Sequence, residues 1–434
     1  MMHYLRSIQP IHLIGIFLLI IIFSPYIIPR LRIDHLILLF LIFYFFFKGR
    51  FFSSPGIYLT IFYLIGFLVT FIRIIFFDDV LTRWSPFFDY MEWLLRGFII
   101  YEFVRLALQD GIDTKDFILI FKIWVFSSLA IGFIALLQMI PFTASVANSF
   151  ISKFYVNKDW LDAINGGSRS ASIINHPGAY GQIFLLSIII MLTARYELFH
   201  SQRLSNLLFF IIVLMSFFSL SKNILLGLPI LFGLYILKLS FQPNTYSKLL
   251  FFLPFLLLAI ILISLNLDIF YSLDLFLLDN LSSKMAYFYT VIKGAVILLL
   301  NSDALFQATL GVRYLESQTG DVTVFLENIF FGVGFTEHFL RLSDSGYTPF
   351  LLVGGLVGFI PLLMYMLSII SNSFEGLNRA EKSKSIFKIR IIFILIIFFN
   401  IIIGLGQQTF TLDKSGDFFF IMAAMLSVLK INKL

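Results

Sequence analysis

The chain contains no cysteine and few charged residues: only 13% of its 434 residues are Asp, Glu, Lys or Arg. The absence of cysteine excludes disulfides, thiolate metal sites and cysteine nucleophiles. No glycine-rich loop ends in Gly-Lys-Ser or Gly-Lys-Thr, so ATP hydrolysis is not expected. No His-Glu-x-x-His or comparable histidine spacing offers a zinc site. Energy and a metal ion must therefore come from elsewhere or not be needed, and no cofactor is expected.

Apolar residues dominate instead, making up 59% of the chain and including 56 phenylalanines. A soluble core cannot hide this much apolar surface. The apolar residues recur in runs whose length is close to the roughly 17 to 25 residues that a helix needs to cross about 30 Å of hydrocarbon. The sequence therefore predicts an all-α polytopic integral membrane protein, with residues 1–434 forming a single transmembrane domain.

About twelve membrane-spanning helices are expected. They lie near residues 11–29, 34–47, 56–77, 87–106, 117–140, 178–194, 205–220, 222–238, 249–267, 347–370, 387–406 and 416–430. The first run is too long for a signal-peptide core and lacks a small-residue cleavage pattern, so we interpret it as a span. Residues 285–300 could form another, but Lys293 in their middle would cost several kcal/mol at the bilayer centre, which favours an interfacial or re-entrant helix.

The distribution of basic residues predicts the orientation. Residues 378–390 carry five Lys or Arg and should face the cytoplasm under the positive-inside rule. Both termini are then cytoplasmic, and the two long connections, residues 141–177 and 268–346, are outer loops, the second large enough for short helices. The short outer loops hold few basic residues, namely Arg30, Arg32, Arg73, Arg83, Lys222 and Lys414. Because the basic residues are dispersed among the spans, the net charge of +6 does not indicate a nucleic-acid partner.

The shorter outer loop ends in the polar stretch GGSRSASIINHPGAYGQ, residues 166–182. Its His-Pro-Gly should break the chain just before a helix begins, because proline disfavours helix at the preceding residue. Arg169, Asn175 and His176 are thereby held near the outer membrane surface. An ordinary interfacial loop, with the arginine reaching the lipid headgroups, explains the same residues equally well.

The longer outer loop contributes a second polar stretch, residues 311–347. Within ENIFFGVGF, Gly332 and Gly334 permit positive φ and close approach by another group, so a glycine turn is expected. The flanking polar candidates are Arg313, Glu327, Asn328, Arg341, Asp344, Ser345 and Tyr347. Alternatives exist here too: Asp344 or Ser345 can simply cap the next helix, and Tyr347 can belong to an interfacial aromatic belt.

Charged residues also lie inside expected spans. Residues 87–106 carry Glu92, Arg96, Glu102 and Arg105, and the first two are four residues apart, where they can pair on one helix face. Charges this deep usually face a bundle interior or a wet cavity, and we favour structural ion pairing over catalysis for them. Metal-dependent membrane glycosyltransferases that use lipid-linked sugars generally carry several acidic residues in their first outer loop. Here that loop offers only Asp34, which does not favour such an enzyme.

These features together resemble the bacterial O-antigen polymerase (Wzy) family, within the superfamily that also includes the O-antigen ligases. The resemblance rests on about twelve spans, two outer loops with an arginine in each, a distal Gly-x-Gly-Phe, a following Asp-Ser-x-Tyr and the glycine-rich helix GGLVGF, residues 354–359. Ligases usually carry a histidine where Asp344 to Tyr347 stand here, which favours a polymerase.

The resemblance implies substrates that are undecaprenyl-diphosphate-linked oligosaccharides, as both donor and acceptor. Arg169 and Arg313 would stabilise negative charge on the leaving diphosphate, and Asp344 would act as the base, with Glu327 and His176 as rivals. The remaining candidates, Asn175, Asn328, Arg341, Ser345 and Tyr347, would bind substrate.

The implied location is the bacterial cytoplasmic membrane, with the active site facing the periplasm or exterior and a chain-length regulator and a flippase as further partners. Two alternatives stay open. A ligase, or a capsule or exopolysaccharide polymerase, would share this architecture and differ in its acceptor. A lipid-linked oligosaccharide flippase would also have about twelve spans but would leave its substrate chemically unchanged.

Overall fold

The computed structural model describes twelve parts of the chain. They are residues 9–28, 31–76, 85–155, 172–174, 177–219, 224, 227–228, 230–233, 328–335, 348–379, 383–404 and 413–429. The proposed spans at 249–267 and 285–300 lie outside these ranges, as does nearly all of the expected outer loop 268–346.

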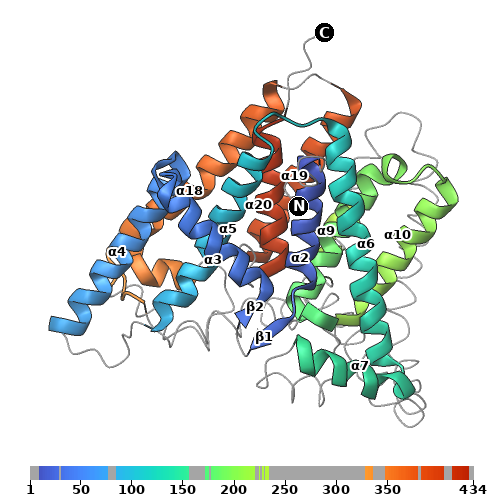
Figure 1. Ribbon diagram of the computed structural model, residues 1–434, viewed down its shortest axis with the longest axis horizontal. Coiled ribbons are helices and arrows are strands. Elements are labelled where there is room, and N and C mark those ends of the chain that lie inside the picture. Colours follow the sequence, from blue (N-terminus) through green and yellow to red (C-terminus); the bar gives the residue numbers. More distant parts are fainter. Residues whose placement is uncertain are drawn as a thin grey trace, which may run out of the picture. The chain divides into compact units, whose positions relative to one another are not determined.

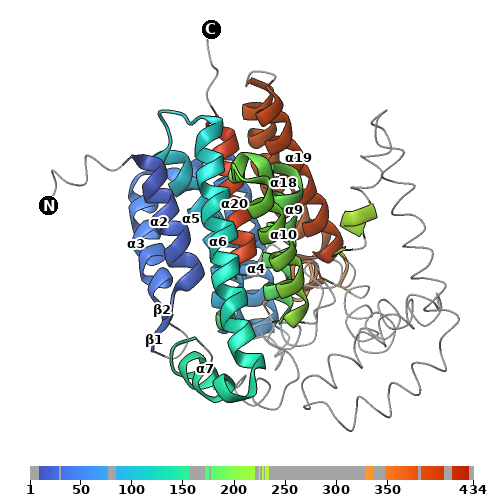
Figure 2. The ribbon, with the colours of Figure 1, turned by 90° about the vertical axis from the view of Figure 1, so that its right-hand side faces the viewer.

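The described residues are mostly helical (Figures 1 and 2). The helices are α2 (Pro10–Phe23), α3 (Ile33–Phe47), α4 (Ser54–Phe76), α5 (Ser85–Ala107), α6 (Thr114–Met139), α7 (Pro141–Phe154), α9 (Pro177–Leu198), α10 (Gln202–Ser216), α18 (Thr348–Arg379), α19 (Lys384–Gly404) and α20 (Asp413–Ser427). Short 3-10 turns occur at Arg50–Phe52, Ser172–Ile174 and Phe217–Ser219. Ten of these helices coincide with predicted spans; α7 is the exception and falls inside the predicted outer loop 141–177.

Among the described residues, four helical segments are long and apolar enough to cross a membrane: Ser54–Phe76, Thr114–Gln138, Gly178–Leu198 and Phe350–Asn378. The apolar helices α2, α3 and α10 are shorter. Helices α3 and α4 also leave many large apolar side chains exposed, as expected for helices that face lipid. The chain is therefore a helical membrane protein, and the number of twelve spans stays a prediction.

The first span is shorter than predicted. Helix α2 ends at Phe23, and the following residues form a two-stranded antiparallel hairpin of β1 (Tyr26–Ile28) and β2 (Leu31–Arg32). Pro25 accounts for the difference, because a proline biases the residue before it toward extended backbone, and Ser24 is extended with ψ of 115°. The hairpin leads directly into α3.

The described chain divides into two compact units, of which the first comprises residues 1–130, 186–210 and 313–434. Its core lies where α20 packs against α5 and α18. Glycines permit this close approach: a Cβ on Gly97 would lie 2.2 Å from the ring of Phe420, and one on Gly376 would lie 1.8 Å from the carbonyl oxygen of Leu426. The indole of Trp124 stacks on Phe418 with ring centroids 4.1 Å apart.

The second unit comprises residues 131–185 and 211–312. Its described part includes the end of α6, all of α7 and the beginning of α9. The Tyr180 hydroxyl donates a hydrogen bond of 2.9 Å to the Met215 carbonyl, and the Tyr180 and Phe184 rings stack 4.5 Å apart. This packing holds the beginning of α9 against the end of α10.

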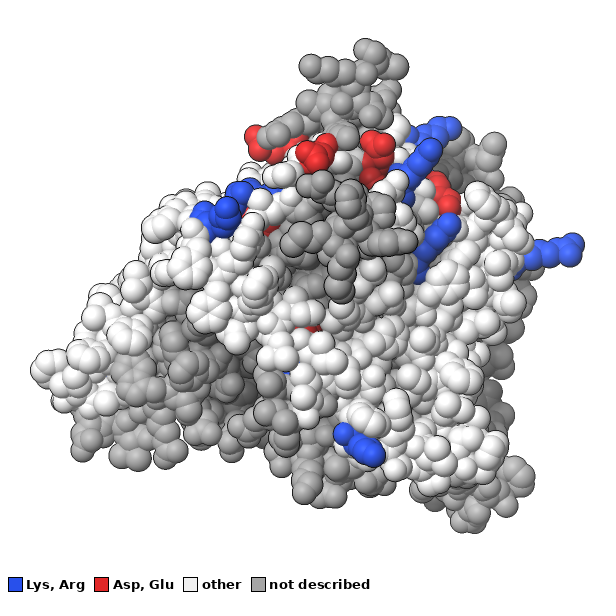
Figure 3. Space-filling view, in the orientation of Figure 1, with Lys and Arg blue, Asp and Glu red and all other residues white. Residues whose placement is uncertain are grey.

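Charged side chains are unevenly distributed on the surface. Figure 3 shows many of them near the upper edge of the visible face, with further basic side chains at the right and near the lower edge. Figure 1 places the turn between α5 and α6 at the upper edge, where Asp110, Asp113 and Lys115 are exposed.

Candidate functional site

Of the ten residues proposed for the site, the structure describes one, Asn328. The others lie outside the described residues: Arg169, Asn175, His176, Arg313, Glu327, Arg341, Asp344, Ser345 and Tyr347. Their roles stay predictions. The structure does describe the glycine motifs around Asn328 and a set of buried charged residues.

Residues 328–335 form the glycine turn that the sequence predicts. The backbone has φ of +72° at Gly332 and +79° at Gly334, and the Gly332 N–H donates to the Asn328 carbonyl over 2.8 Å. Side chains other than glycine rarely adopt this conformation. The predicted positive φ at both glycines is thus confirmed.

The glycine turn fits into a break in α18. At Gly355 the backbone leaves helical geometry, with φ of 56° and ψ of −156°. The carbonyls of Leu352 and Val353 accept hydrogen bonds of 2.6 and 3.0 Å from the N–H groups of Val333 and Gly334. In return, the carbonyls of Ile329 and Phe330 accept bonds of 2.8 and 3.0 Å from Leu356 and Val357.

Residues 354–359 were predicted as part of a continuous helix, and this was wrong at Gly355. The break is possible because the turn supplies partners for the backbone groups that the helix no longer pairs, as a segment within a membrane requires. The two motifs also fit sterically. A Cβ on Gly332 would lie 2.3 Å from the Leu352 carbonyl oxygen, and one on Gly355 would lie 2.5 Å from the Phe330 carbonyl oxygen.

Helix α4 holds the other side of the turn. The Thr70 hydroxyl accepts a hydrogen bond of 2.8 Å from the Phe335 N–H and donates one of 2.7 Å to the Gly66 carbonyl. A Cβ on Gly334 would lie 2.6 Å from that hydroxyl oxygen. The close fit fixes the distance between the turn and α4.

One turn of helix beyond Thr70, the guanidinium of Arg73 donates a hydrogen bond to the side-chain oxygen of Asn328. The sequence had placed Arg73 only as a basic residue of a short outer loop. The structure brings it to the one described member of the predicted site. A guanidinium presents several donors to phosphate or carboxylate oxygens, so the contact puts an anion-binding group beside the glycine turn.

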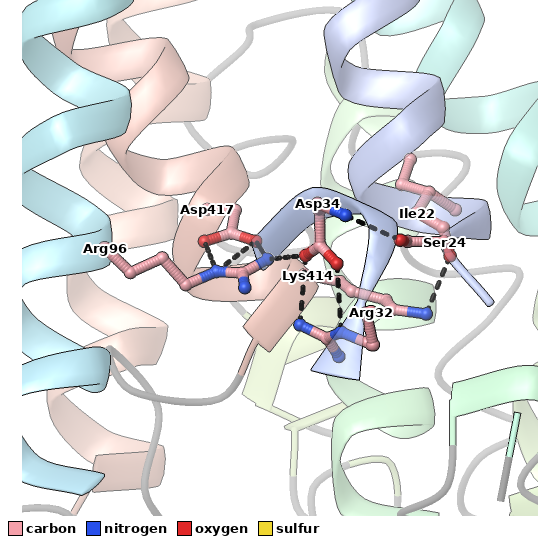
Figure 4. Close-up of polar contacts among 7 residues, drawn as sticks. All are labelled: Ile22, Ser24, Arg32, Asp34, Arg96, Lys414 and Asp417. Atoms are coloured by element: carbon pink, nitrogen blue, oxygen red, sulfur yellow. Dashed lines mark hydrogen bonds and ion pairs between the residues drawn. The ribbon is translucent and has the colours of Figure 1, made fainter. Parts of the chain in front are cut away.

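A second set of polar residues is buried where α3 begins. Figure 4 shows Asp34 between Arg32 and Arg96. The Arg32 guanidinium donates to both Asp34 carboxylate oxygens, at 3.1 and 3.0 Å, and the Asp34 N–H donates to the Ser24 hydroxyl over 2.9 Å. Arg32 was expected in a short outer loop, but it is buried.

Arg96 links this pair to α20. Its Nε lies 2.8 and 3.1 Å from the two carboxylate oxygens of Asp417, and its Nη2 lies 2.6 Å from Asp417 and 2.7 Å from Asp34. The side chains of Arg96, Asp34 and Asp417 are 4%, 0% and 4% exposed. Structural ion pairing was predicted for Arg96, and it does pair, although with Asp34 and Asp417; the side chain of its predicted partner Glu92 lies outside the described residues.

Lys414 adds a third cation, and its Nζ donates to the Ile22 carbonyl over 2.7 Å. We call Arg32, Asp34, Arg96, Lys414 and Asp417 the ion cluster. It joins the end of α2, the beginnings of α3 and α20 and the middle of α5 (Figure 4). Further along α5, the Glu102 carboxylate pairs with the Arg105 guanidinium, with Oε2 and Nη2 3.3 Å apart. Buried pairs of this kind persist only where their charges are matched and hydrogen-bonded.

Gln138, near the end of α6, bonds two parts of the segment predicted as the shorter outer loop. Its amide nitrogen donates to the Asn148 side-chain oxygen at 2.9 Å, and its amide oxygen accepts from the Ser172 N–H at 3.0 Å. Helix α9 begins at Pro177, as the His-Pro-Gly motif predicts. Gln138 therefore ties α7 and the segment before α9 to one point.

Within the described ranges, no three histidine, aspartate or glutamate side chains gather as they would to hold a metal ion. No protein-family model, curated protein or solved structure matches this chain. Any functional assignment consequently depends on the residues and geometry above.

Proposed function

We propose that this protein polymerises polysaccharide at the outer face of a bacterial cytoplasmic membrane. The donor and acceptor are undecaprenyl-diphosphate-linked oligosaccharides. The bond between the growing chain and its lipid diphosphate breaks, and a glycosidic bond forms to a hydroxyl at the non-reducing end of a new unit. The hydroxyl proton passes to a base, and the diphosphate leaves with the electron pair.

The observation that supports this proposal most directly is the fit between the glycine turn and the break in α18. Two motifs carry the resemblance to O-antigen polymerases, Gly-x-Gly-Phe and GGLVGF. They are separate in the sequence but pack directly against each other. Irregular backbone at membrane depth is tolerated where it is buried in protein or lines a cavity, and interrupted helices often build sites for polar substrates.

Arg73 places a positive charge, which the proposed reaction requires, beside these two motifs. It contacts Asn328, a proposed substrate-binding residue, and its permanent positive charge can stabilise the leaving diphosphate. In the proposed mechanism Arg73 joins Arg169 and Arg313 in binding phosphate. Asp344 remains the proposed base.

The predicted topology supports an outer location. With both termini cytoplasmic and twelve spans, the ends of α2 and α4 and the beginnings of α3, α18 and α20 point outward. The glycine turn, Arg73 and the ion cluster then all belong to the outer half of the first unit. A lipid diphosphate delivered to that face by a flippase would meet Arg73 at the membrane surface.

The proposal is tested by the length of surface polysaccharide in a strain lacking this gene. We expect the wild type to restore long chains, and Arg313→Ala and Arg73→Ala to leave single repeat units on the acceptor. Arg203→Ala is the matched control, because Arg203 is an exposed arginine at the beginning of α10 and should not alter chain length. Each variant must reach the membrane in wild-type amounts.

The same experiment separates the alternatives. If deletion removes even the single repeat unit, a ligase or a flippase explains the gene better than a polymerase. Full rescue by both Arg313→Ala and Arg73→Ala would contradict the proposed phosphate-binding roles. Elongation by purified protein with lipid-linked substrate would exclude a flippase, since transport leaves the substrate unchanged.

A further inference from the structure

Helix α7 exposes a stripe of apolar side chains. Phe142, Val146, Phe150 and Phe154 recur every four residues, and the first two are 83% and 72% exposed. Residues at this spacing lie one above another on a helix face. Four large apolar side chains are thus presented together, away from the other described residues of the second unit.

Polar residues border the stripe. Ser145 and Ser149 are exposed beside it, and the ammonium of Lys153 lies 5.5 Å from the Phe154 ring centroid. On the opposite face Ile151 is buried. The exposed surface of α7 is therefore itself amphipathic, with aromatic rings on one side and hydroxyls on the other.

The position of α7 relative to a membrane span is fixed by short connections. The candidate span in α6 ends at Gln138 and α7 begins at Pro141, so they are joined by two residues, and the Cα atoms of Gln138 and Pro141 are at most about 11 Å apart. The Thr143 hydroxyl donates to the Leu137 carbonyl over 2.7 Å, and Gln138 bonds Asn148. These bonds hold α7 at the end of the span.

We infer that α7 is an interfacial helix that inserts Phe142, Val146 and Phe150 among the lipid chains at the membrane surface where α6 ends. Helices with an aromatic face and a polar or basic face lie in this plane, with the apolar face about 5–10 Å below the headgroups. Lys153 extends toward lipid phosphate, as long basic side chains do at this depth. A bilayer fits better than a protein partner, because α7 follows a candidate membrane span after only two residues and therefore starts at the membrane surface.

The chain's lack of cysteine makes this inference simple to test. Single cysteines are introduced as Phe142→Cys, Val146→Cys and Phe150→Cys in the stripe, and as Ser145→Cys and Ser149→Cys beside it. Each protein carries a nitroxide label and is reconstituted in vesicles of phosphatidylethanolamine and phosphatidylglycerol. Accessibility of the label to oxygen, which concentrates in lipid, is compared with its accessibility to a water-soluble nickel chelate.

We expect the three stripe positions to favour oxygen and the two serine positions to favour nickel, alternating with the helical period. Equal nickel accessibility at all five would overturn the inference. Shielding of the stripe from both reagents would also overturn it, because a protein partner or a second copy would then cover α7.

A second readout applies where a cysteine variant does not fold. Val146→Trp adds a fifth tryptophan to the native four, and its fluorescence should be quenched by bromine-substituted lipid chains. Quenching no greater than that of the native protein would contradict insertion. Neither measurement depends on the proposed polymerase activity.

Discussion

Loss of one carboxylate from the ion cluster should strongly destabilise the protein. In Asp417→Asn, Arg96 loses a charged partner that now accepts three hydrogen bonds, of 2.8, 3.1 and 2.6 Å. Arg96 keeps Asp34, but that carboxylate is shared with Arg32. The guanidinium would stay buried with less compensation for the loss of water.

The expected loss of stability in Asp417→Asn follows from the burial of the Arg96 and Asp417 side chains. Removing one partner of a buried pair costs about 3–5 kcal/mol, and the remaining bond to Asp34 places the expected cost near the lower end, about 3 kcal/mol. Lys388 and Glu197 form a comparison pair whose side chains are 35% and 27% exposed. Glu197→Gln should cost about 1 kcal/mol or less, because water screens exposed pairs.

The free energy of unfolding of the wild type and both single variants is measured in the same detergent at low and high salt. Asp417→Asn should lose several times more stability than Glu197→Gln. Its loss should also be nearly independent of salt, since salt screens exposed charges far more than buried ones. Equal losses of 1 kcal/mol or less in both variants would refute the reasoning.

The double variant Arg96→Met/Asp417→Leu separates the two possible uses of the cluster. Replacing both members of a buried pair with apolar residues is often neutral for stability. We therefore expect the double variant to be more stable than Asp417→Asn. If it also elongates polysaccharide normally, the cluster is only structural, whereas a stable but inactive double variant would give Arg96 or Asp417 a part in the reaction.

Three other variants test the remaining contacts. Gly355→Ala should destabilise the first unit by about 1–3 kcal/mol in the same unfolding assay, because its positive φ disfavours a side chain, whereas Gly354→Ala should change little, since its Cβ would meet only a methyl group at 3.7 Å. Thr70→Val should cost about 1–3 kcal/mol by leaving the buried Phe335 N–H without its acceptor. Gln138→Leu should accelerate hydrogen exchange in α7 about fivefold or more, because a loss of about 1 kcal/mol shifts an equilibrium by that factor.

Much of the helical framework could be predicted from apolar runs alone. Run length and polar interruptions gave the approximate limits of α4, α5 and α6, because each span must remain apolar across the hydrocarbon. The prediction was wrong after Phe23, where apolar residues continue but Pro25 ends the helix. Hydropathy does not distinguish an apolar helix from an apolar hairpin, so only the proline could have given the signal.

Within the site, local conformation was predictable and pairing was not. Positive φ at Gly332 and Gly334 follows from the residue type. The break at Gly355 was missed because it depends on hydrogen bonds from a turn more than twenty residues earlier in the chain. Asp34 and Asp417 gave a weak signal of buried ion pairing, since each lies within three residues of a basic residue where an apolar run begins. The sequence alone could not show that Arg96 pairs with both.

The ion cluster and the glycine turn hold two helices that pack against each other, α20 and α18 respectively. Helix α20, which carries Asp417, is fixed to the part of α18 after Gly355 by the close approach at Gly376 and by a hydrogen bond of 3.0 Å from the Ser373 hydroxyl to the Ala423 carbonyl. The short part of α18 before Gly355 is held by the glycine turn and α4 instead. A continuous helix would transmit any displacement of α20 along its whole length, whereas the break lets the turn and α4 set the position of the part before Gly355. That division would keep Arg73 and Asn328 in place independently of the ion cluster that anchors α20.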